Sequence, residues 1–558
     1  MHQRLLFEQE KISARLLLIA GLLTLTACGG GGNGAGSSDV TAEKVACESL
    51  TGTALAGGTV LSANTVVAGA FTPAGQKTAI ADLPAFCRVS VAMKPSSDSK
   101  IAVEVWMPRE NWNGRFLGTG NGGGGGAIAL STGMMEGLKR GFAVANTDLG
   151  TAPDANLLID HPERWKDFGY RANHEMTVAG KSLVNAYYKS TPRKSYFAGC
   201  STGGQQAMAI AQRYPDDYNG IIAGAPANNR THLHSMFAFN AQQLSNAGIN
   251  QAKSLLISTR VIQACAGKDG GAPSDAFITD PRQCKFDAES LPKCTGADND
   301  SCLTVPQLAA VKAVWNGVVN PRTGERIFTG FPLGAEGNPV FGLPFFASPA
   351  VEATQLYMFK WALGANWNVA TFDRDVQMDV VDSKVGSILN ANSTDYERFS
   401  AAGSKIMMFN GTADAGVPFA DPLAYYERVV KAQGDNIAQT QDFFRFYLVP
   451  GMGHCSGVTG GAGPGEFGQP YSSYVPKDKE HDILLKLVDW VENGNSPESF
   501  IATKYADATG TIVAAERPIC TYPKIPTYQG GDTSIATSFK CMDGPRNGVP
   551  IPSLRYSN

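Results

Sequence analysis

The sequence has little of what marks nucleic-acid-binding, zinc-binding or membrane-spanning proteins. Only 17% of its 558 residues are charged, the net charge is −3, and no basic run is present to follow a phosphate backbone. No Cys-x₂-Cys pair occurs, which argues against a structural zinc site. The apolar run at 16–25 is too short to cross a bilayer as a permanent helix. We therefore expect no nucleic-acid partner and no permanent membrane span.

The N-terminus resembles an export signal. Lys11 and Arg15 precede the apolar run, which ends in Leu-Thr-Ala-Cys at 25–28. The pattern is typical of a bacterial lipoprotein, so we predict a signal peptide at 1–27 and membrane attachment through a lipid on Cys28. The alternative is an ordinary secretory signal with a chance cysteine. Both interpretations predict an exported protein, which is a periplasmic or outer-membrane lipoprotein or a secreted enzyme.

Strand, tight turn and helix follow one another around Ser201. The apolar run Tyr196 to Ala198 leads into Gly-x-Ser-x-Gly at 199–203, and a helix-forming segment, Gln205 to Arg213, comes next. Glycines two positions before and after a serine allow a sharp turn that projects its hydroxyl at the carboxyl edge of a sheet. This context predicts a nucleophilic serine. The alternative is a chance match in a chain with 62 glycines.

An acid and a base lie downstream of the serine. Asp414 and His454 each follow an apolar strand predicted at the same sheet edge, which gives the chain order Ser, Asp, His of α/β-hydrolases. The competing acid is Asp421. The one other histidine beyond Asp414, His481, opens an amphipathic helix, where a surface or capping role is expected. We therefore predict Ser201 as nucleophile, His454 as base and Asp414 as the acid that orients it.

Cysteines flank two of these residues. Cys200 precedes Ser201 and Cys455 follows His454, so a serine and histidine in contact would bring two sulfurs within disulfide distance. The competing interpretation makes Cys200 a thiolate nucleophile, although Ser201 occupies the centre of the turn. With Cys28 set aside, ten cysteines remain, and an exported chain with an even number of cysteines most simply forms disulfides.

A glycine run at 122–126 follows the strand predicted at 114–118. Its spacing does not fit a dinucleotide-binding loop. A bare backbone lets an amide approach a reacting carbonyl oxygen, so we predict an oxyanion hole formed by the Thr202 amide and that of Gly122 or Gly123. The alternative is a flexible linker.

Strands and helices alternate from Ile101 onward and resume near Lys405. This rhythm predicts a mostly parallel sheet covered on both faces. Residues 228–392 differ, with cysteine pairs, Pro- and Gly-containing turns and many aromatic residues, and we predict an inserted lid there. The expected class is α/β, an α/β-hydrolase fold with a large inserted lid domain. Its parts are a Gly/Ser-rich tether at 28–45, a catalytic domain at 46–227 and 393–558, and the lid at 228–392.

The motifs together resemble the tannase and feruloyl esterase family. The resemblance is carried by Gly-Cys-Ser-Thr-Gly-Gly at 199–204, Gly-Thr-Ala-Asp at 411–414 and Pro-Gly-Met-Gly-His-Cys at 450–455. It implies the α/β-hydrolase fold, the Ser-His-Asp triad and hydrolysis of aromatic esters with no cofactor for catalysis. It also implies five disulfides, which join Cys47 to Cys87, Cys200 to Cys455, Cys265 to Cys284, Cys294 to Cys302 and Cys520 to Cys541.

The same family carries a structural calcium in the lid loop closed by the third of these disulfides. Asp269 and Asp275 match its ligand positions, and the carbonyl of Phe277 is the third oxygen that the resemblance implies. Ala266 and Thr279 stand where the family often has Asp, and the loop is longer. Because calcium takes about six or more oxygens, the alternative is a disulfide-closed loop with solvated acids.

The sequence thus predicts an exported serine esterase that hydrolyses small aromatic esters such as feruloyl or galloyl esters. The alternatives are an exported serine peptidase or amidase, and a non-catalytic surface lipoprotein that binds aromatic compounds. Residues 355–360 lack the arginine with which terephthalate-monoester hydrolases of the family hold a free carboxylate, which argues against that substrate. The lid aromatics that are candidates to flank the acyl group are Phe345, Phe346, Tyr357, Phe359, Trp361 and Trp367.

Overall fold

The computed structural model describes residues 44–73, 77–457, 460–472, 474, 476, 478–507, 509–546 and 548–557. The predicted signal peptide, Cys28 and the tether up to residue 43 lie outside these residues. Of the helices within the described ranges, none has both the length and the apolarity that crossing a membrane requires.

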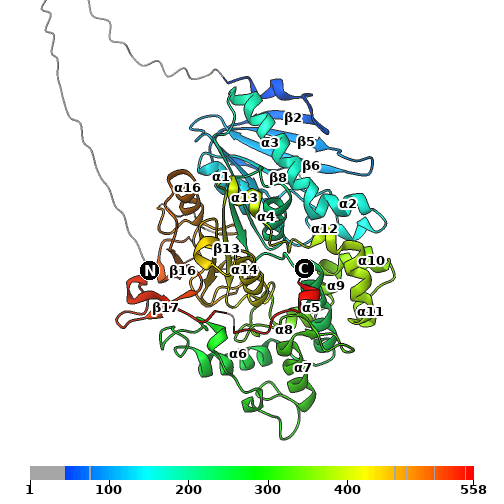
Figure 1. The fold of residues 1–558 in the computed structure, drawn as a ribbon, viewed down its shortest axis with the longest axis vertical. Coiled ribbons are helices and arrows are strands. Elements are labelled where there is room, and N and C mark those ends of the chain that lie inside the picture. The colour runs from blue at the N-terminus through cyan, green and yellow to red at the C-terminus, as the bar shows by residue number, and fades with distance from the viewer. Residues whose placement is uncertain are drawn as a thin grey trace, which may run out of the picture. The chain divides into compact units, whose positions relative to one another are not determined.

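A ten-stranded sheet forms the centre of the fold, in the order β1-β2-β5-β6-β8-β7-β9-β10-β13-β14 (Figure 1). From β8 through β7 to β14 every pair is parallel, whereas β1, β2, β5, β6 and β8 pair antiparallel. In chain order the strands are Ala54–Leu55, Gly58–Val66, Phe86–Met93, Ile101–Pro108, Arg115–Thr119 (β7), Ala143–Thr147 (β8), Lys194–Cys200, Gly220–Gly224, Lys405–Gly411 and Phe444–Val449.

Helices cover both faces of this sheet. A Cβ on Gly180 would come within 2.7 Å of the Phe116 ring, and a Cβ on Gly137 within 2.7 Å of Leu117. Gly180 belongs to α3 (Ala172–Tyr188) and Gly137 to α1 (Met135–Lys139). Because Phe116 and Leu117 are successive residues of β7, their side chains point to opposite faces. The two helices therefore lie on opposite sides of the sheet, and glycine allows each to pack closely.

The parallel strands predicted from the sequence are present, and the sheet also extends further than predicted. The expected strand at 220–224 is β10 with the same bounds, and the strand expected at 405–409 continues to Gly411 in β13. The sequence prediction of a mostly parallel sheet did not include β1, β2 and β5. Because these strands pair antiparallel, the observed sheet is mixed. These strands are joined without crossover helices, and therefore give no βα rhythm in the sequence.

The segment between β10 and β13 is mainly helical, and α5 to α8 lie together in green in Figure 1. Its helices and strands up to residue 392 are α5 (Arg230–Leu244), α6 (Gln251–Cys265), α7 (Val305–Asn316), β11 (Val318–Val319), β12 (Arg326–Phe328), α8 (Leu343–Ala347), α9 (Ala350–Gln355), α10 (Tyr357–Leu363), α11 (Val376–Val381) and α12 (Ser387–Leu389).

The remaining elements surround the sheet. They are β3 (Gly69–Phe71), β4 (Ile80–Leu83), α2 (Pro162–Lys166), α4 (Thr202–Arg213), α13 (Glu397–Ala401), α14 (Ala420–Ala432), α15 (Ile437–Gln441), α16 (Ile483–Asn493), β15 (Ser499–Tyr505), β16 (Val513–Cys520), β17 (Lys524–Tyr528) and β18 (Phe539–Asp543). Of these, α4 packs on β9 and β10 and leads directly out of the Ser201 turn.

Five disulfides join Cys47 to Cys87, Cys200 to Cys455, Cys265 to Cys284, Cys294 to Cys302 and Cys520 to Cys541. These are the pairs that the family resemblance implies. Four of them close short loops, with sequence separations of 8 to 40 residues, whereas one spans 255. That long-range bond connects two parts of the parallel sheet edge.

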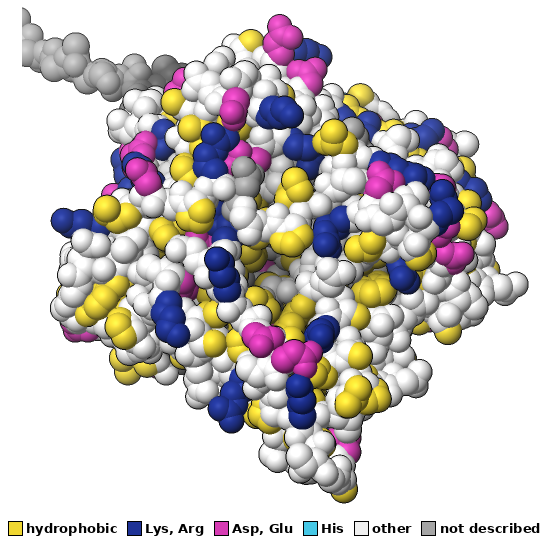
Figure 2. Space-filling view, turned by 60° about the horizontal axis from the view of Figure 1, so that its bottom comes forward, with side chains coloured by type: hydrophobic (Ala, Val, Ile, Leu, Met, Phe, Trp, Pro, Cys, Tyr) yellow, Lys and Arg dark blue, Asp and Glu magenta, His cyan; other side chains and the backbone are white. Residues whose placement is uncertain are grey.

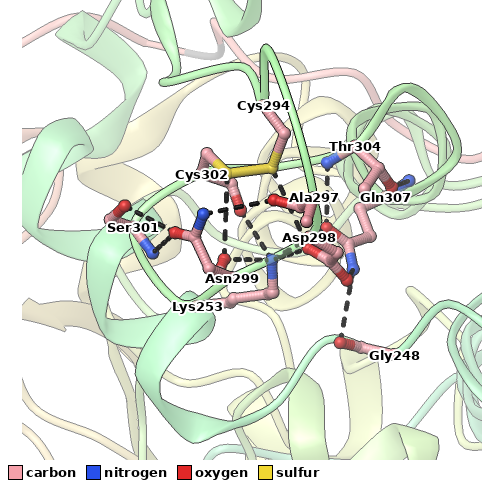
Figure 3. The surroundings of a disulfide bond; sticks show 10 residues. All are labelled: Gly248, Lys253, Cys294, Ala297, Asp298, Asn299, Ser301, Cys302, Thr304 and Gln307. Atoms are coloured by element: carbon pink, nitrogen blue, oxygen red, sulfur yellow. Dashed lines mark hydrogen bonds and ion pairs between the residues drawn. A yellow bond between two sulfur atoms is a disulfide. The ribbon is translucent and has the colours of Figure 1, made fainter.

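The loop between Cys294 and Cys302 encloses the ammonium group of Lys253 (Figure 3). Lys253 Nζ donates to Asp298 Oδ1 at 2.6 Å, to the Asn299 carbonyl at 2.7 Å and to the Cys302 carbonyl at 2.6 Å. The lysine side chain is 3% exposed. Because a buried charge is costly without such partners, the disulfide loop and α6 are coupled through this lysine.

Charged side chains of both signs are scattered among hydrophobic ones on the face shown in Figure 2. Lys and Arg side chains are spread over this face, and Asp and Glu side chains lie among them. Such mixing leaves this face without the extended field of one sign that steers a charged partner.

Candidate active site

The turn at Ser201 depends on close backbone packing. Ser201 lies between β9 and α4 with φ 64°, a conformation that non-glycine residues rarely adopt outside functional sites. A Cβ on Gly199 would lie 2.4 Å from the carbonyl oxygen of Gly203, so only glycine fits there. The Ser201 N–H donates to the Gly224 carbonyl at 3.0 Å, which fixes the turn to the end of β10. Ser201 is half-buried and directly precedes the first residue of α4.

Asp414 fixes the orientation of His454. Asp414 Oδ2 lies 2.9 Å from His454 Nδ1, and the aspartate side chain is completely buried. The N–H groups of Gly416 and Val417 donate to Asp414 Oδ1 at 2.9 and 2.8 Å and hold the carboxylate in place. A carboxylate can only accept, so in the neutral imidazole Nδ1 carries the proton and Nε2 keeps a lone pair.

A disulfide connects the neighbours of Ser201 and His454. Cys200 and Cys455 have Cα atoms 5.9 Å apart, and the bond joins β9 to the loop after β14. Ser201 and His454 both line one cavity of about 210 Å³. The covalent link therefore holds the serine turn beside the histidine loop, and it restricts the relative motion of the two side chains.

Specific donors hold the carbonyl groups of the glycine loop. The Gly122 carbonyl accepts from the Gly125 N–H at 3.1 Å, and the Gly123 carbonyl accepts from Thr202 Oγ1 at 2.6 Å. Because the N–H of a trans peptide points opposite to its C=O, fixing a carbonyl also directs the adjoining N–H. Gly122, Gly123 and Thr202 line the same cavity as Ser201.

Arg230 is a buried residue that the sequence analysis did not single out. Its Nη1 donates to Thr202 Oγ1 and its Nη2 to the Gly123 carbonyl, both at 3.1 Å, and Nη2 also donates to the Tyr357 hydroxyl. The guanidinium lies over the Phe168 ring, 4.8 Å from its centroid. Arg230 thus links the glycine loop to the first turn of α4.

One face of α5 forms a wall of the cavity. Arg230, Leu233, His234 and Phe237 all line it and follow the spacing i, i+3, i+4, i+7, which places them on one side of a helix. That spacing was the available sequence signal. It was missed because nearly every residue of α5 is buried, so the helix has little amphipathic contrast.

The sequence profile described as "Tannase and feruloyl esterase" matches residues 87–542. The chain belongs to the tannase and feruloyl esterase family. An uncharacterized esterase from Xanthomonas campestris pv. campestris is 36% identical over 92% of this chain and 95% of its own length. A probable feruloyl esterase B-2 from Aspergillus terreus is 31% identical over 85% of this chain and 91% of its own length.

Solved structures of the family share the fold. The crystal structure of feruloyl esterase B from Aspergillus oryzae superposes with a TM-score of 0.82 at 28% identity, over 89% of this chain and 99% of the other. Tannin acyl hydrolase from Aspergillus niger gives a TM-score of 0.70 at 22% identity, over 89% and 95%. The chain therefore has the α/β-hydrolase fold of this family. Like the family, it is an esterase and needs no cofactor for catalysis.

The cavity of this tannase and feruloyl esterase family member has aromatic walls other than those predicted. Phe237, Phe341 and Tyr471 line it, whereas none of the six predicted lid aromatics does. Five of the six are buried in the protein interior: the rings of Phe359 and Trp367, for example, are stacked 4.8 Å apart. Phe345 is half-buried, and its ring centroid lies 5.0 Å from that of Phe341. The predicted set is Phe345, Phe346, Tyr357, Phe359, Trp361 and Trp367.

The competing acid and histidine lie elsewhere. Asp421 is buried on α14, accepts from Asn229 Nδ2 at 3.1 Å, and burial raises its pKa to about 6. His481 Nδ1 lies 2.8 Å from Asp478 Oδ1, while Asp482 caps α16. None of these residues lines the cavity of Ser201.

The residues of the expected calcium loop are engaged with other groups. Asp269 accepts the N–H groups of Gly271, Thr279 and Asp280, and Asp275 Oδ1 pairs with Arg517 Nη2 at 2.5 Å. Both side chains of the Asp275–Arg517 pair are 4% exposed, so a guanidinium already supplies the positive charge. Among the described residues, no group of three or more His, Cys, Asp or Glu side chains is placed to hold a metal ion. These contacts favour a loop that is closed by its disulfide and held by Arg517, and the calcium site stays a prediction.

Proposed function

We propose that the protein is an exported serine esterase that hydrolyses phenolic carboxylic esters, such as feruloyl or galloyl esters, through an acyl-enzyme. One observation carries the proposal: Ser201 on its tight turn and His454, oriented by Asp414, line one cavity and are flanked by the two halves of a disulfide. The named feruloyl esterases and the tannin acyl hydrolase among its relatives support the substrate class.

In the first step His454 Nε2 takes the proton of the Ser201 hydroxyl while its oxygen attacks the ester carbonyl. The negative charge that develops on the carbonyl oxygen is stabilised by the Thr202 amide together with that of Gly122 or Gly123. Collapse of this intermediate breaks the ester C–O bond, and His454 returns the proton to the leaving alcohol.

In the second step His454 removes a proton from water, which attacks the acyl-enzyme carbonyl. The acid leaves when the Ser201 oxygen regains a proton from His454. Throughout, Asp414 remains ionised and stabilises the imidazolium that forms twice in each turnover.

Export and the domain arrangement are part of the proposal. Five disulfides are typical of proteins that fold in oxidising compartments, which supports the signal peptide at 1–27, and we propose lipid attachment at Cys28. We also propose that residues 228–392 act as a lid over a catalytic domain at 46–227 and 393–558. The support is that α5, at the start of the lid, forms one wall of the Ser201 cavity.

A fluorophosphonate probe and an ester panel test this function. The wild-type protein should label at Ser201 and hydrolyse methyl ferulate or methyl gallate faster than a terephthalate monoester, and Ser201→Ala should lose both labelling and hydrolysis. An aryl ester and the matching anilide, assayed in parallel, distinguish an esterase from a peptidase. Labelling without any ester hydrolysis, or full hydrolysis by Ser201→Ala, would overturn the proposal.

A further inference from the structure

His234 lines the same cavity as Ser201 and His454. It lies on α5 one turn after Arg230, between Leu233 and Phe237, and its ring centroid is 5.2 Å from that of Phe237. Leu233, Phe237 and Phe341 give the same cavity apolar walls. An aromatic acyl group held between these side chains would bring its ring substituents toward a polar imidazole.

The tautomer of His234 is determined by the backbone of a neighbouring helix. Its Nδ1 lies 2.5 Å from the carbonyl oxygen of Gln355, at the end of α9. A carbonyl oxygen can only accept, so Nδ1 carries the proton and Nε2 has a lone pair. Burial, reinforced by the nearby positive charge of Arg230, lowers the pKa of His234 well below its ordinary value. The ring is therefore neutral at physiological pH, and Nε2 is an acceptor.

The lone pair on Nε2 is available to a ligand. No described residue hydrogen-bonds this nitrogen, and it is not among the fully enclosed polar atoms that lack a partner. It therefore opens on the cavity that His234 lines. A buried acceptor of this kind is best satisfied by a donor on the bound molecule.

Arg230 is the one Lys or Arg among the residues that line the cavity, and its guanidinium is directed toward oxygens of the protein. Both terminal nitrogens of Arg230 donate to protein oxygens, those of Gly123, Thr202 and Tyr357. A ring carboxylate facing the His234 lone pair would meet an acceptor and remain unpaired, whereas a ring hydroxyl would donate to it. The chemistry of this wall thus favours a phenol over a carboxylate or a methyl ether.

We propose that His234 Nε2 accepts a hydrogen bond from a hydroxyl on the aromatic ring of the acyl group, and so selects hydroxylated acyl groups. The proposal rests on the esterase function above and specifies which residue recognises the phenol. It also explains why the histidine is held by a backbone carbonyl, because the opposite tautomer would present an N–H to the phenol and lose the selection.

The experiment compares kcat/KM for methyl hydroxycinnamates, hydroxylated at position 3 or 4, with that for their O-methylated counterparts. In the wild type the ratio should favour the better hydroxylated ester by about 10-fold or more, because the methyl ether leaves Nε2 unpaired. His234→Asn retains a donor near the position of Nδ1 but removes the acceptor, so the ratio should fall to near one. His234→Gln restores an acceptor near the position of Nε2 and should recover part of the preference.

Tyr471→Phe is the matched control. Tyr471 lines the same cavity, and its hydroxyl, like the side-chain amide of Gln355, is a further neutral group there that can hydrogen-bond a phenol. The ratio should persist in this variant. A ratio that collapses in Tyr471→Phe and persists in His234→Asn would overturn the assignment to His234, as would a preference that follows the alcohol instead of the acyl group.

Failure of this inference is separable from failure of the proposed function. If hydrolysis depends on Ser201 but the ratio is the same in His234→Asn as in the wild type, the esterase stands and the role of His234 is wrong. If no aromatic ester is hydrolysed, the function itself is wrong. Fluorophosphonate labelling shows whether each variant is folded. If His234→Asn does not label, the other two proteins decide. A wild-type ratio near one, or a ratio in His234→Gln equal to that of the wild type, overturns the proposal, and a high wild-type ratio with a lower one in His234→Gln supports it.

Discussion

Asp414 Oδ2 lies 2.9 Å from His454 Nδ1, and two backbone N–H groups hold the aspartate from the other side. Replacing this aspartate by asparagine preserves the size of the side chain but places an amide opposite Nδ1. The amide donates, so His454 would carry its proton on Nε2 and lose the lone pair that accepts the serine proton.

We therefore expect Asp414→Asn to reduce kcat by about 10³- to 10⁴-fold with little change in folding. The measurement is steady-state hydrolysis of the best aryl ester, with circular dichroism as a check on structure. Asp421→Asn is the control, because Asp421 is equally buried but pairs with Asn229. Equal losses in the two variants would show that Asp414 has no special relation to His454.

The disulfide between Cys200 and Cys455 should contribute more to stability than any short-loop disulfide. In the entropic model a bond that closes 255 residues restricts the unfolded chain by about 5 kcal/mol, and one that closes 8 residues by about 2 to 3 kcal/mol. Removing each pair by alanine substitution should therefore lower the free energy of unfolding by unequal amounts. Guanidinium unfolding of the Cys200/Cys455 and Cys294/Cys302 double variants measures both.

The same two double variants should differ in catalysis. Loss of the Cys200–Cys455 bond frees the loop of His454 from the turn of Ser201, so kcat should fall even where the protein remains folded. The Cys294–Cys302 loop surrounds Lys253 and contributes no residue to the cavity, so its removal should leave kcat near the wild-type value. A wild-type kcat in the Cys200/Cys455 variant would show that the disulfide only stabilises the fold.

The positive charge of Arg517, in place of a metal ion, should stabilise the loop around Asp275. Both side chains of this pair are 4% exposed, so Arg517→Gln leaves a buried carboxylate without its partner and should cost about 3 to 5 kcal/mol. Arg322→Gln removes the partner of Asp375. Because the Arg322 side chain is 61% exposed, this change should lower the free energy of unfolding by less than about 1 kcal/mol. Chemical unfolding of the two variants gives the comparison.

A chelator should not change the stability of the wild-type protein. EDTA removes calcium from oxygen ligands but leaves the Asp275–Arg517 pair intact, so the unfolding midpoint should be the same with and without it. A midpoint that falls in EDTA and recovers with added calcium would show that the loop binds the ion.

The sequence indicated the turn at Ser201 and the position of His454 better than the walls of the cavity. The turn at Ser201 was predictable because Gly199 and Gly203 have a conformational and packing requirement that few other residues meet. His454 could be selected by chain order alone. The residues that line the cavity could not be selected, because Arg230 and His234 come from a helix in which nearly every residue is buried. Such a helix has too little amphipathic contrast to show which side faces a ligand.

The antiparallel strands β1, β2 and β5 were not predicted from the sequence for a different reason. Parallel strands need crossover connections, so β7 to β10 and β13 are indicated by the alternation of strands and helices in the sequence. In contrast, β2 and β5 are connected through the small β3–β4 hairpin, without a helix between them. Their pairing is settled by contacts across the sheet, such as Ala63 opposite Val89. Tertiary packing of this kind decides strand formation more than local preference does.

Glu336 should make stability depend on pH in the neutral range. Its side chain is completely buried beside Trp315, whose Nε1 donates to Oε1 at 2.9 Å, and burial raises the pKa of Glu336 from 4.5 to about 7. Because the pKa of this carboxyl is higher in the folded than in the unfolded state, its contribution to stability is fully present below the unfolded-state value of 4.5. This contribution is lost as the pH rises through the folded-state value of about 7. The shift corresponds to about 3 kcal/mol.

Glu336→Gln removes this titration. The difference in the free energy of unfolding between the variant and the wild type should therefore move in favour of the variant by about 3 kcal/mol between pH 4.5 and pH 8. Urea unfolding at several pH values measures it. Glu397→Gln, an exposed position on α13, should follow the wild type at every pH. A difference that stays constant with pH for Glu336→Gln would mean that the glutamate ionises in the folded protein as easily as in the unfolded chain, and that its Oε2, which has no partner among the described residues, is hydrated.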